Sequence, residues 1–404
     1  MTLLDISAPF HDWLVGLRRA FHKIPELAYK ELKTSAKIAE TLGSLGVPCR
    51  TGVGRTGVVA WLDADRPGPM VAMRADMDAL PVEEKNDVPY KSKHPGLMHA
   101  CGHDAHVTMA LGVARLLVEF GWRDTGRGKI FFVFQPAEEG GAGAVEMLQG
   151  GGLDREPIEA IFAAHLHPEH PMGVIAMADG VANASSDNIS IRVIGKGGHG
   201  AHPDMCRDPI VAAANLVVQL QTIVSRSLDP LVPAVLTIGK FQAGTASNVV
   251  PDEARLSGTL RTLDSEVREI ALRRIREILQ GLEAAFGVST ELRVKPGYPV
   301  LINDRKIVGW IAERGRALLG EGGVQFRPPS MGAEDFAYFL EKFPGAMVRL
   351  GCHDPAEGFT HGLHSPYFSF DERTLDVGVR LFADLLSAYA DSGPGSGSET
   401  DRMS

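Results

Sequence analysis

The sequence has little cysteine, no long apolar run and no cluster of basic residues. Its four cysteines, Cys49, Cys101, Cys206 and Cys352, stand far apart among 404 residues and form no Cys-x-x-Cys pair. So few cysteines exclude a disulfide framework and favour a reducing, cytoplasmic setting. No stretch of about 18 apolar residues could form a membrane-spanning helix. The first residues lack the basic and apolar regions of a signal peptide, so none is expected.

The balance of charge is mildly acidic. Asp and Glu number 50 against 41 Lys and Arg, which gives a formal net charge of -9. Because phosphate binding needs clustered Lys and Arg, nucleic acid is not an expected partner. The hydrophobic fraction of 44% and the charged fraction of 23% are typical of a globular protein. A chain of this length suits about two domains.

Strand-like and helix-like patterns alternate in the first part of the chain. Apolar residues recur at helical spacing over 13–45, with a break at Pro25, and again over 101–120. Continuous apolar runs that read as buried strands are 57–62, 70–74, 129–134 and 158–165. This alternation predicts an α/β fold with a mixed, largely parallel-centred sheet.

A second pattern begins near residue 184. The predicted elements follow the order β-α-β-β-α-β, which is typical of a ferredoxin-like α+β unit. They are strand 188–194, helix 208–226, strands 234–241 and 253–262, helix 264–286 and strand 289–294. We therefore predict a domain over 184–294 that is inserted into a catalytic domain of residues 1–183 and 295–390. The Ser- and Gly-rich residues 391–404 are predicted to form a disordered tail.

The segment MHACGHDAH (98–106) holds three His, one Cys and one Asp. Cys101 and His103 could ligate a metal, as a soft thiolate beside an imidazole. Asp104 could orient a ligating imidazole from outside the ligand set, as carboxylates often do. The alternative is a His-rich loop at the start of a helix that binds no metal.

Further polar residues follow apolar strands. Glu138 and Glu139 come directly after the run ending at Phe134, where one carboxylate could bind a cation while its neighbour reaches a water. A solvated acidic turn is the alternative. His165 follows another apolar strand, and His364 lies in a late Gly-Leu-His-Ser-Pro segment. Several such positions at strand ends favour one shared metal centre over independent structural roles.

At these residues the chain resembles the M20 metallopeptidase family. The resemblance is to its amidohydrolase branch, which includes hippurate hydrolases, N-acyl-amino-acid hydrolases and indole-acetyl-amino-acid hydrolases. The similar segments, in order, are RRAFHKIPELAYKE, RADMDALPVEE, HACGHDAHVTMALG, FQPAEEGGAGA, HLHP, GKGGHGAHP, NVVPDEARLSGTLRT, MGAEDFAYF and LHSPYF. The family's activity implies metal-dependent hydrolysis of N-acyl amino acids, which releases a carboxylic acid and a free amino acid.

The resemblance also implies a metal site with two divalent ions per subunit. Its ligands would be Cys101, His103, Glu139, His165 and His364. Such a mixed set of Cys, His and Glu suits zinc or manganese, and cobalt or nickel could also be accommodated. Glu138 would be the general base and acid.

Other roles follow from the same resemblance. The inserted domain would act as a lid and as the surface of a homodimer, and its His199 would stabilise the oxyanion in the partner protomer's site. Asn248 and Arg261 would contact the substrate, which is a small molecule. Wider M20 branches begin their metal site with a His-x-Asp motif, where this chain has Asp76-Met77-Asp78. Asp78 is therefore expected to support the ligands, and a larger role for Asp76 or Asp78 stays open.

Two other functions are compatible with parts of the pattern. A thiol hydrolase would use Cys101 as nucleophile and His103 as base, and would need neither Glu138 nor the remote histidines. A non-catalytic metal- or ligand-binding protein would have no need of Glu138. Chelation and thiol alkylation separate the first alternative from a metal enzyme, and a turnover assay separates the second.

Overall fold

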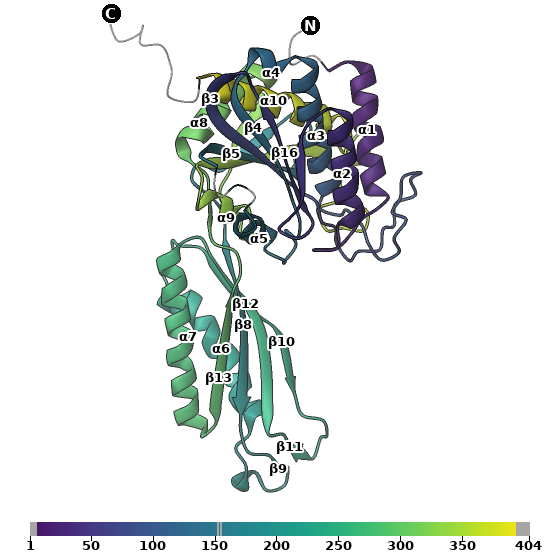
Figure 1. Cartoon of the computed structure of the whole chain (residues 1–404). Coiled ribbons are helices and arrows are strands. Elements are labelled where there is room, and N and C mark those ends of the chain that lie inside the picture. The colour runs from purple at the N-terminus through teal and green to yellow at the C-terminus, as the bar shows by residue number, and fades with distance from the viewer. Residues whose placement is uncertain (1–5, 152, 154–155, 393–404) are drawn as a thin grey trace, which may run out of the picture. The chain divides into compact units, whose positions relative to one another are not determined.

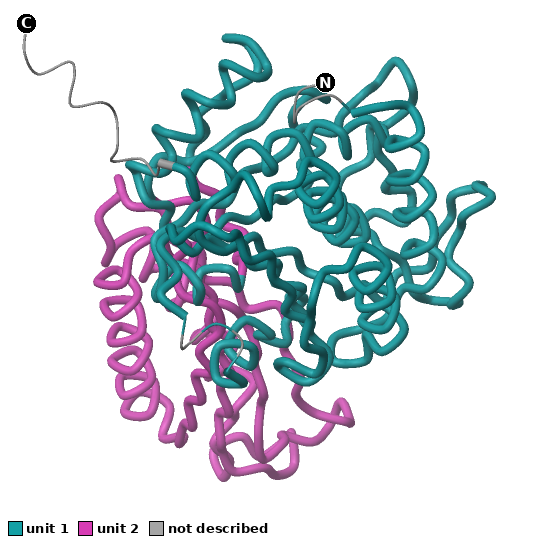
Figure 2. The backbone as a smooth tube through the Cα atoms, turned by 45° about the horizontal axis from the view of Figure 1, so that its top comes forward, with its two compact units in different colours: residues 1–180, 302–328, 335–404 teal, residues 181–301, 329–334 magenta. Residues whose placement is uncertain are grey.

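The computed structural model describes residues 6–392 apart from 152 and 154–155 (Figure 1). The chain divides into two compact units, coloured separately in Figure 2. Unit 1 comprises Met1–Gly180, Ile302–Pro328 and Asp335–Ser404, and unit 2 comprises Val181–Leu301 and Pro329–Glu334. Within the described part of the chain, no helix is both long enough and apolar enough to cross a membrane.

Unit 1 is built on an eight-stranded sheet in the order β1-β2-β4-β3-β5-β16-β6-β15. The strands are β1 (Cys49–Val53), β2 (Gly57–Asp63), β3 (Arg66–Asp76), β4 (Arg127–Gln135), β5 (Ile158–Pro171), β6 (Ile175–Met177), β15 (Val324–Phe326) and β16 (Gly345–His353). The central neighbours β4, β3, β5 and β16 run parallel, whereas β1, β2 and the β16–β6 pair are antiparallel. The predicted mixed, parallel-centred sheet is therefore confirmed, and the carboxyl ends of four strands meet at one edge.

Helices pack on this sheet around one apolar core. The longer ones are α1 (Ala8–His22), α2 (Leu32–Ser44), α3 (His103–Glu119), α8 (Arg305–Leu319) and α10 (Thr374–Ser392). Helix α3 is buried along most of its length between α1, α10 and the sheet, because it is apolar on nearly every side. The N-terminal helical pattern is two helices, with Pro25 in the connection between them. Asp391 and Ser392, predicted to begin the tail, lie in α10, and residues 393–404 lie outside the described residues.

Gly128, at the start of β4, offers a stability test of this packing. Its φ is +71°, and a Cβ there would lie 1.9 Å from the carbonyl oxygen of Pro69 on β3. Gly128→Ala should therefore lower the free energy of unfolding by about 3 kcal/mol, through both strain and backbone overlap. Gly16→Ala, on the exposed side of α1 with open space around it, should instead stabilise by about 0.5–1 kcal/mol. Urea unfolding of both variants checks the pair, and equal midpoints would contradict it.

Unit 2 is an α+β sandwich of two layers. Its main strands are β8 (Ser185–Ile194), β10 (Ala234–Ala243), β12 (Glu253–Thr262) and β13 (Ser289–Pro296), in the antiparallel order β10-β12-β8-β13. Helices α6 (Pro209–Thr222) and α7 (Ser265–Phe286) pack together against this sheet around a second apolar core. The β-α-β-β-α-β order predicted from the sequence is therefore confirmed. Each helix begins at an aspartate, Asp208 or Asp264, whose side chain accepts backbone N–H groups of the first turn.

Candidate metal centre

The candidate metal ligands of unit 1 come from separate segments that meet at the carboxyl edge of the sheet. Glu139 follows β4 and His165 lies in β5. Cys101 and His103 stand at the start of α3, and His364 lies in the loop between β16 and α10. Three of the groups whose ligand atoms all lie within 4.8 Å of one another consist only of predicted ligands and Glu138: Cys101, His103 and His165; Cys101, Glu139 and His364; and His103, Glu138 and Glu139. The structure thus brings all five predicted ligands together with Glu138.

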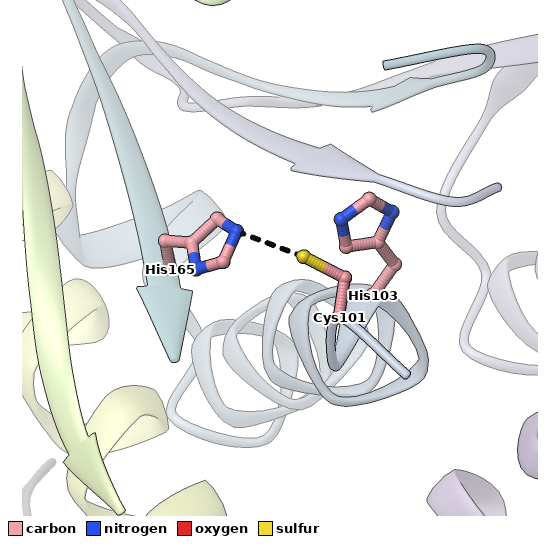
Figure 3. A group of neighbouring side chains, drawn as sticks. All are labelled: Cys101, His103 and His165. Atoms are coloured by element: carbon pink, nitrogen blue, oxygen red, sulfur yellow. Dashed lines mark hydrogen bonds between the residues drawn. The ribbon is translucent and has the colours of Figure 1, made fainter. Parts of the chain in front are cut away.

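Cys101 belongs to two of these groups. Its Sγ is 3.5 Å from Nε2 of His165, and His103 stands beside them (Figure 3). Nδ1 of His165 is 2.7 Å from the carbonyl oxygen of Leu166, so it carries the proton and leaves Nε2 as a lone-pair donor toward Cys101. Between Cys101 and His103, Gly102 has a φ of +83°, and a Cβ there would lie 2.9 Å from Leu166. This glycine lets the chain turn sharply between two ligands.

Glu139 and His364 form the opposite side of the cluster. Nε2 of His364 is 3.2 Å from Oε1 of Glu139, and 54% of the His364 side chain is exposed. Hydrogen bonding to Cys101 and Glu139 raises the pKa of His364 to about 10. The cluster therefore favours positive charge at this position. His364 has a φ of +63°, and its N–H donates to the carbonyl of Ala100, which anchors this strained residue beside Cys101.

The surroundings of His103 fit a bound cation. The side chain is fully buried, and in the described structure neither ring nitrogen has a partner with hydrogen-bond geometry, although Nδ1 lies 3.3 Å from Oδ1 of Asp78. Burial opposes a charge on this ring, but nearby Asp76 and Cys101 outweigh it and raise the pKa of His103 well above its ordinary value. Buried polar groups are rarely left without partners, so nitrogen, sulfur and carboxylate donors around this ring match a metal site.

Asp78 and Asp76 support the centre from the end of β3. Asp78 accepts the backbone N–H groups of Glu138 and Glu139, each at 3.0 Å, so it fixes both glutamates. Asp76 lies 2.6 Å from Nδ1 of His106, whose Nε2 accepts the N–H of Leu166 at 2.9 Å. Both nitrogens of His106 are therefore engaged. From the sequence, His106 is expected to flank the ligands rather than to bind metal, and a role of Asp76 beyond support stays open; the contact between the two is a finding of the structure.

Asp104, predicted to orient a metal ligand, has different neighbours. Its Oδ2 is 2.7 Å from Nδ1 of His22 and 2.9 Å from Nε of Arg18, both on α1. All three side chains are buried. Their contacts join the start of α3 to α1.

Glu138, predicted to be the general base, lies beside the candidate ligands. The residue is 6% exposed, and its backbone N–H donates to Asp78. A carboxylate oxygen lies within 4.8 Å of ligand atoms of both His103 and Glu139. The Glu138 carboxylate therefore lies beside the candidate ligands, but it belongs to neither of the two groups that contain Cys101.

Unit 2 carries the three remaining predicted residues. His199 lies on β9 (Gly198–His199), which pairs with β11 (Val249–Val250), and Asn248 directly precedes β11. The carbonyl oxygen of Asn248 accepts the N–H of Gly200, so His199 and Asn248 share one small ribbon. Nδ1 of the exposed His199 accepts the N–H of Ala201 at 3.1 Å, which leaves Nε2 as the ring donor. Arg261 lies apart from them, on β12 opposite Val235.

The sequence matches the family described as peptidase family M20/M25/M40 over residues 72–388. It is 41% identical over 380 residues to N-acetyl-L-cysteine deacetylase of Bacillus subtilis, covering 93% of this chain and 89% of that protein. It is 38% identical over 384 residues to IAA-amino acid hydrolase ILR1-like 4 of Arabidopsis thaliana, covering 94% and 86%.

A solved structure agrees with these sequence matches. The YXEP protein of Bacillus subtilis, titled a dinuclear metal binding peptidase from the M20 family, superposes with a TM-score of 0.83. It is 35% identical, and the match covers 95% of this chain and 99% of that one. The chain therefore belongs to peptidase family M20/M25/M40 and is an amidohydrolase of that family.

Proposed function

We propose that this enzyme hydrolyses the amide bond of N-acyl amino acids with two divalent metal ions. The observation that carries the proposal is that the ligand atoms of Cys101, His103, Glu139, His165 and His364 fall into overlapping groups, in which the ring of His103 is buried without a hydrogen-bond partner among the described residues. Relatives named as a deacetylase of N-acetyl-L-cysteine and as a hydrolase of IAA-amino acids support this substrate class. Zinc or manganese suits the donor set best, and cobalt or nickel is also compatible.

The bound ions would supply Lewis-acid chemistry, which polarises the amide carbonyl and lowers the pKa of water from 15.7 to about 7. Glu138 takes the proton of the attacking water and delivers it to the nitrogen of the leaving amino acid. Asp78 orients Glu138 by accepting its backbone N–H. Asp76 and His106 fix the part of β5 that carries His165, because Nε2 of His106 accepts the N–H of Leu166.

Unit 2 completes the proposal. We assign His199 to the oxyanion of the partner protomer's site, where its Nε2–H would donate, and we assign Asn248 and Arg261 to the substrate. This arrangement requires a homodimer through unit 2, which would also act as a lid. The four cysteines are free thiols, which supports a reducing, cytoplasmic setting.

A thiol hydrolase is the less favoured alternative. A nucleophilic cysteine needs a lowered pKa. Burial instead raises the pKa of Cys101. The alternative also leaves Glu139 and His364 without a function, although both lie against Cys101.

A panel of substrates tests the proposed activity. We expect measurable turnover with at least one of hippurate, N-acetyl-methionine, N-acetyl-cysteine and indole-acetyl-alanine, because all present an N-acyl amide beside a carboxylate. The carboxyl esters of the same N-acyl amino acids, which lack the free carboxylate, and the free amino acids, which lack the amide, serve as controls. Release of the amino acid is followed by amine detection, together with metal analysis. Metal binding without turnover of any of these amides would favour a non-catalytic binding protein.

A further inference from the structure

The backbone that carries Glu138 is strained. Ala137 and Ala142 have a φ of +55° each, and Gly140 between them has a φ of +87°. A left-handed conformation is unfavourable for a residue with a side chain, and each such residue persists only where its surroundings hold it. The loop therefore depends on contacts from outside itself for the position of Glu138.

One such contact comes from Glu31, the last residue of the RRAFHKIPELAYKE segment, to which no function has been assigned so far. Glu31 is completely buried, with 0% of the residue exposed. Its Oε1 accepts the N–H of Ala137 at 2.9 Å, and its Oε2 accepts the hydroxyl of Thr56 at 2.6 Å. Both donors are neutral, and a buried carboxylate is costly to fold. The hydrogen bond between Glu31 and the strained Ala137, directly before Glu138, is a contribution that offsets this cost.

A second contact comes from Tyr29, two residues earlier. Its hydroxyl donates to the carbonyl oxygen of Gly141 at 2.7 Å. Glu31 and Tyr29 thus bind the loop on either side of the Glu138–Glu139 pair, while Asp78 binds the pair itself. Glu31, Asp78 and Tyr29 together bind four backbone groups of the loop, which are the N–H groups of residues 137, 138 and 139 and the carbonyl of residue 141.

We infer that Glu31 and Tyr29 are positioning residues that hold Glu138 in its catalytic orientation through the backbone of residues 137–141. This inference rests on the proposed role of Glu138 as general base. It predicts that losing these contacts lowers kcat, because a misplacement of about 1 Å can cost up to about 100-fold in rate. Metal binding and KM should change little, because Glu31 binds Ala137, which adjoins Glu138 and not Glu139, while the Glu139 backbone keeps its own bond to Asp78.

Glu31→Leu removes the acceptor and is the main test. We expect kcat to fall by about 10- to 100-fold, with metal content and KM within about twofold of the parent. Glu31→Gln should restore most of the rate, because its oxygen can still accept the Ala137 N–H while its amide donates to Thr56. Tyr29→Phe should lower kcat by about 3- to 10-fold on the same grounds, and it serves as the test should Glu31→Leu fail to fold.

Glu26→Leu is the matched control. Glu26 belongs to the same segment and also accepts backbone N–H groups, but those of Thr34 and Lys33 at the start of α2. This variant should lose stability and keep the parental kcat. An equal loss of kcat in Glu26→Leu and Glu31→Leu would overturn the inference, because the effect would then be general destabilisation.

A double variant, Glu31→Leu with Glu138→Gln, tests the positioning role of Glu31 separately from the proposed role of Glu138 as general base. If Glu31 acts through Glu138, adding Glu31→Leu to Glu138→Gln should not lower the residual rate further. The same fold-loss in both backgrounds, a parental kcat in Glu31→Leu, or a loss of metal in that variant would each overturn the inference. A parental rate in Glu138→Gln itself would instead refute the proposed general base.

Discussion

Glu138→Gln is expected to keep its metal ions and to lose about 100- to 10,000-fold of its turnover. The amide has nearly the shape of the carboxylate but cannot accept the proton of the attacking water, and a positioned acid/base of this kind contributes about that factor. Glu138 lies within 4.8 Å of ligand atoms of His103 and Glu139, so it is close enough to the predicted centre to reach such a water. Initial rates and metal content of the same preparation give the comparison.

Glu159→Gln is the matched control for that variant. Glu159 is the exposed second residue of β5 and lies in the same unit. It precedes His165 along that strand and is not among the candidate metal ligands of the described residues. It should retain the parental rate and the parental metal content. A Glu138→Gln protein that hydrolyses at the parental rate would remove Glu138 from the mechanism, and loss of metal would recast it as a ligand.

Removal of metal is expected to abolish hydrolysis altogether. Neutral water is a poor nucleophile and an amide a poor electrophile, so the residues of the site cannot sustain turnover without the cations. Dialysis against EDTA should reduce the rate to background, and adding back zinc, manganese, cobalt or nickel should restore it. His103→Ala should lower both metal content and rate, because the His103 ring contributes to two of the three ligand groups.

His11→Ala provides the control for the ligand variant. His11 is only partly buried, and its Nδ1 lies 2.8 Å from Asp376. It belongs to none of the groups of candidate metal ligands found in the described part of the chain. Its substitution should leave metal content and rate unchanged. Full activity after chelation, together with inactivation by iodoacetamide, would instead support a thiol hydrolase built on Cys101.

Much of the site could be predicted because of where its residues stand along the chain. Glu139 follows one apolar run and His165 ends another, and the carboxyl ends of neighbouring parallel strands meet at one edge. The order of strands could not be predicted in the same way. β4 and β5 both pair with β3, and β16 joins β5 across about 180 residues of sequence, whereas hydrophobic periodicity reports only on local structure.

Periodicity and side-chain chemistry were enough to predict the main helices and strands, the α/β and α+β patterns of the two units and the residue types able to bind a metal. The tertiary structure decided which side chains meet. Asp104 contacts α1 rather than a predicted ligand, Asp76 pairs with His106, and Glu31 reaches Ala137 across more than 100 positions. Residues 329–334, which follow the return of the chain to unit 1, also belong to unit 2. Such pairings arise only when separate segments pack together and each buried polar group must find a partner.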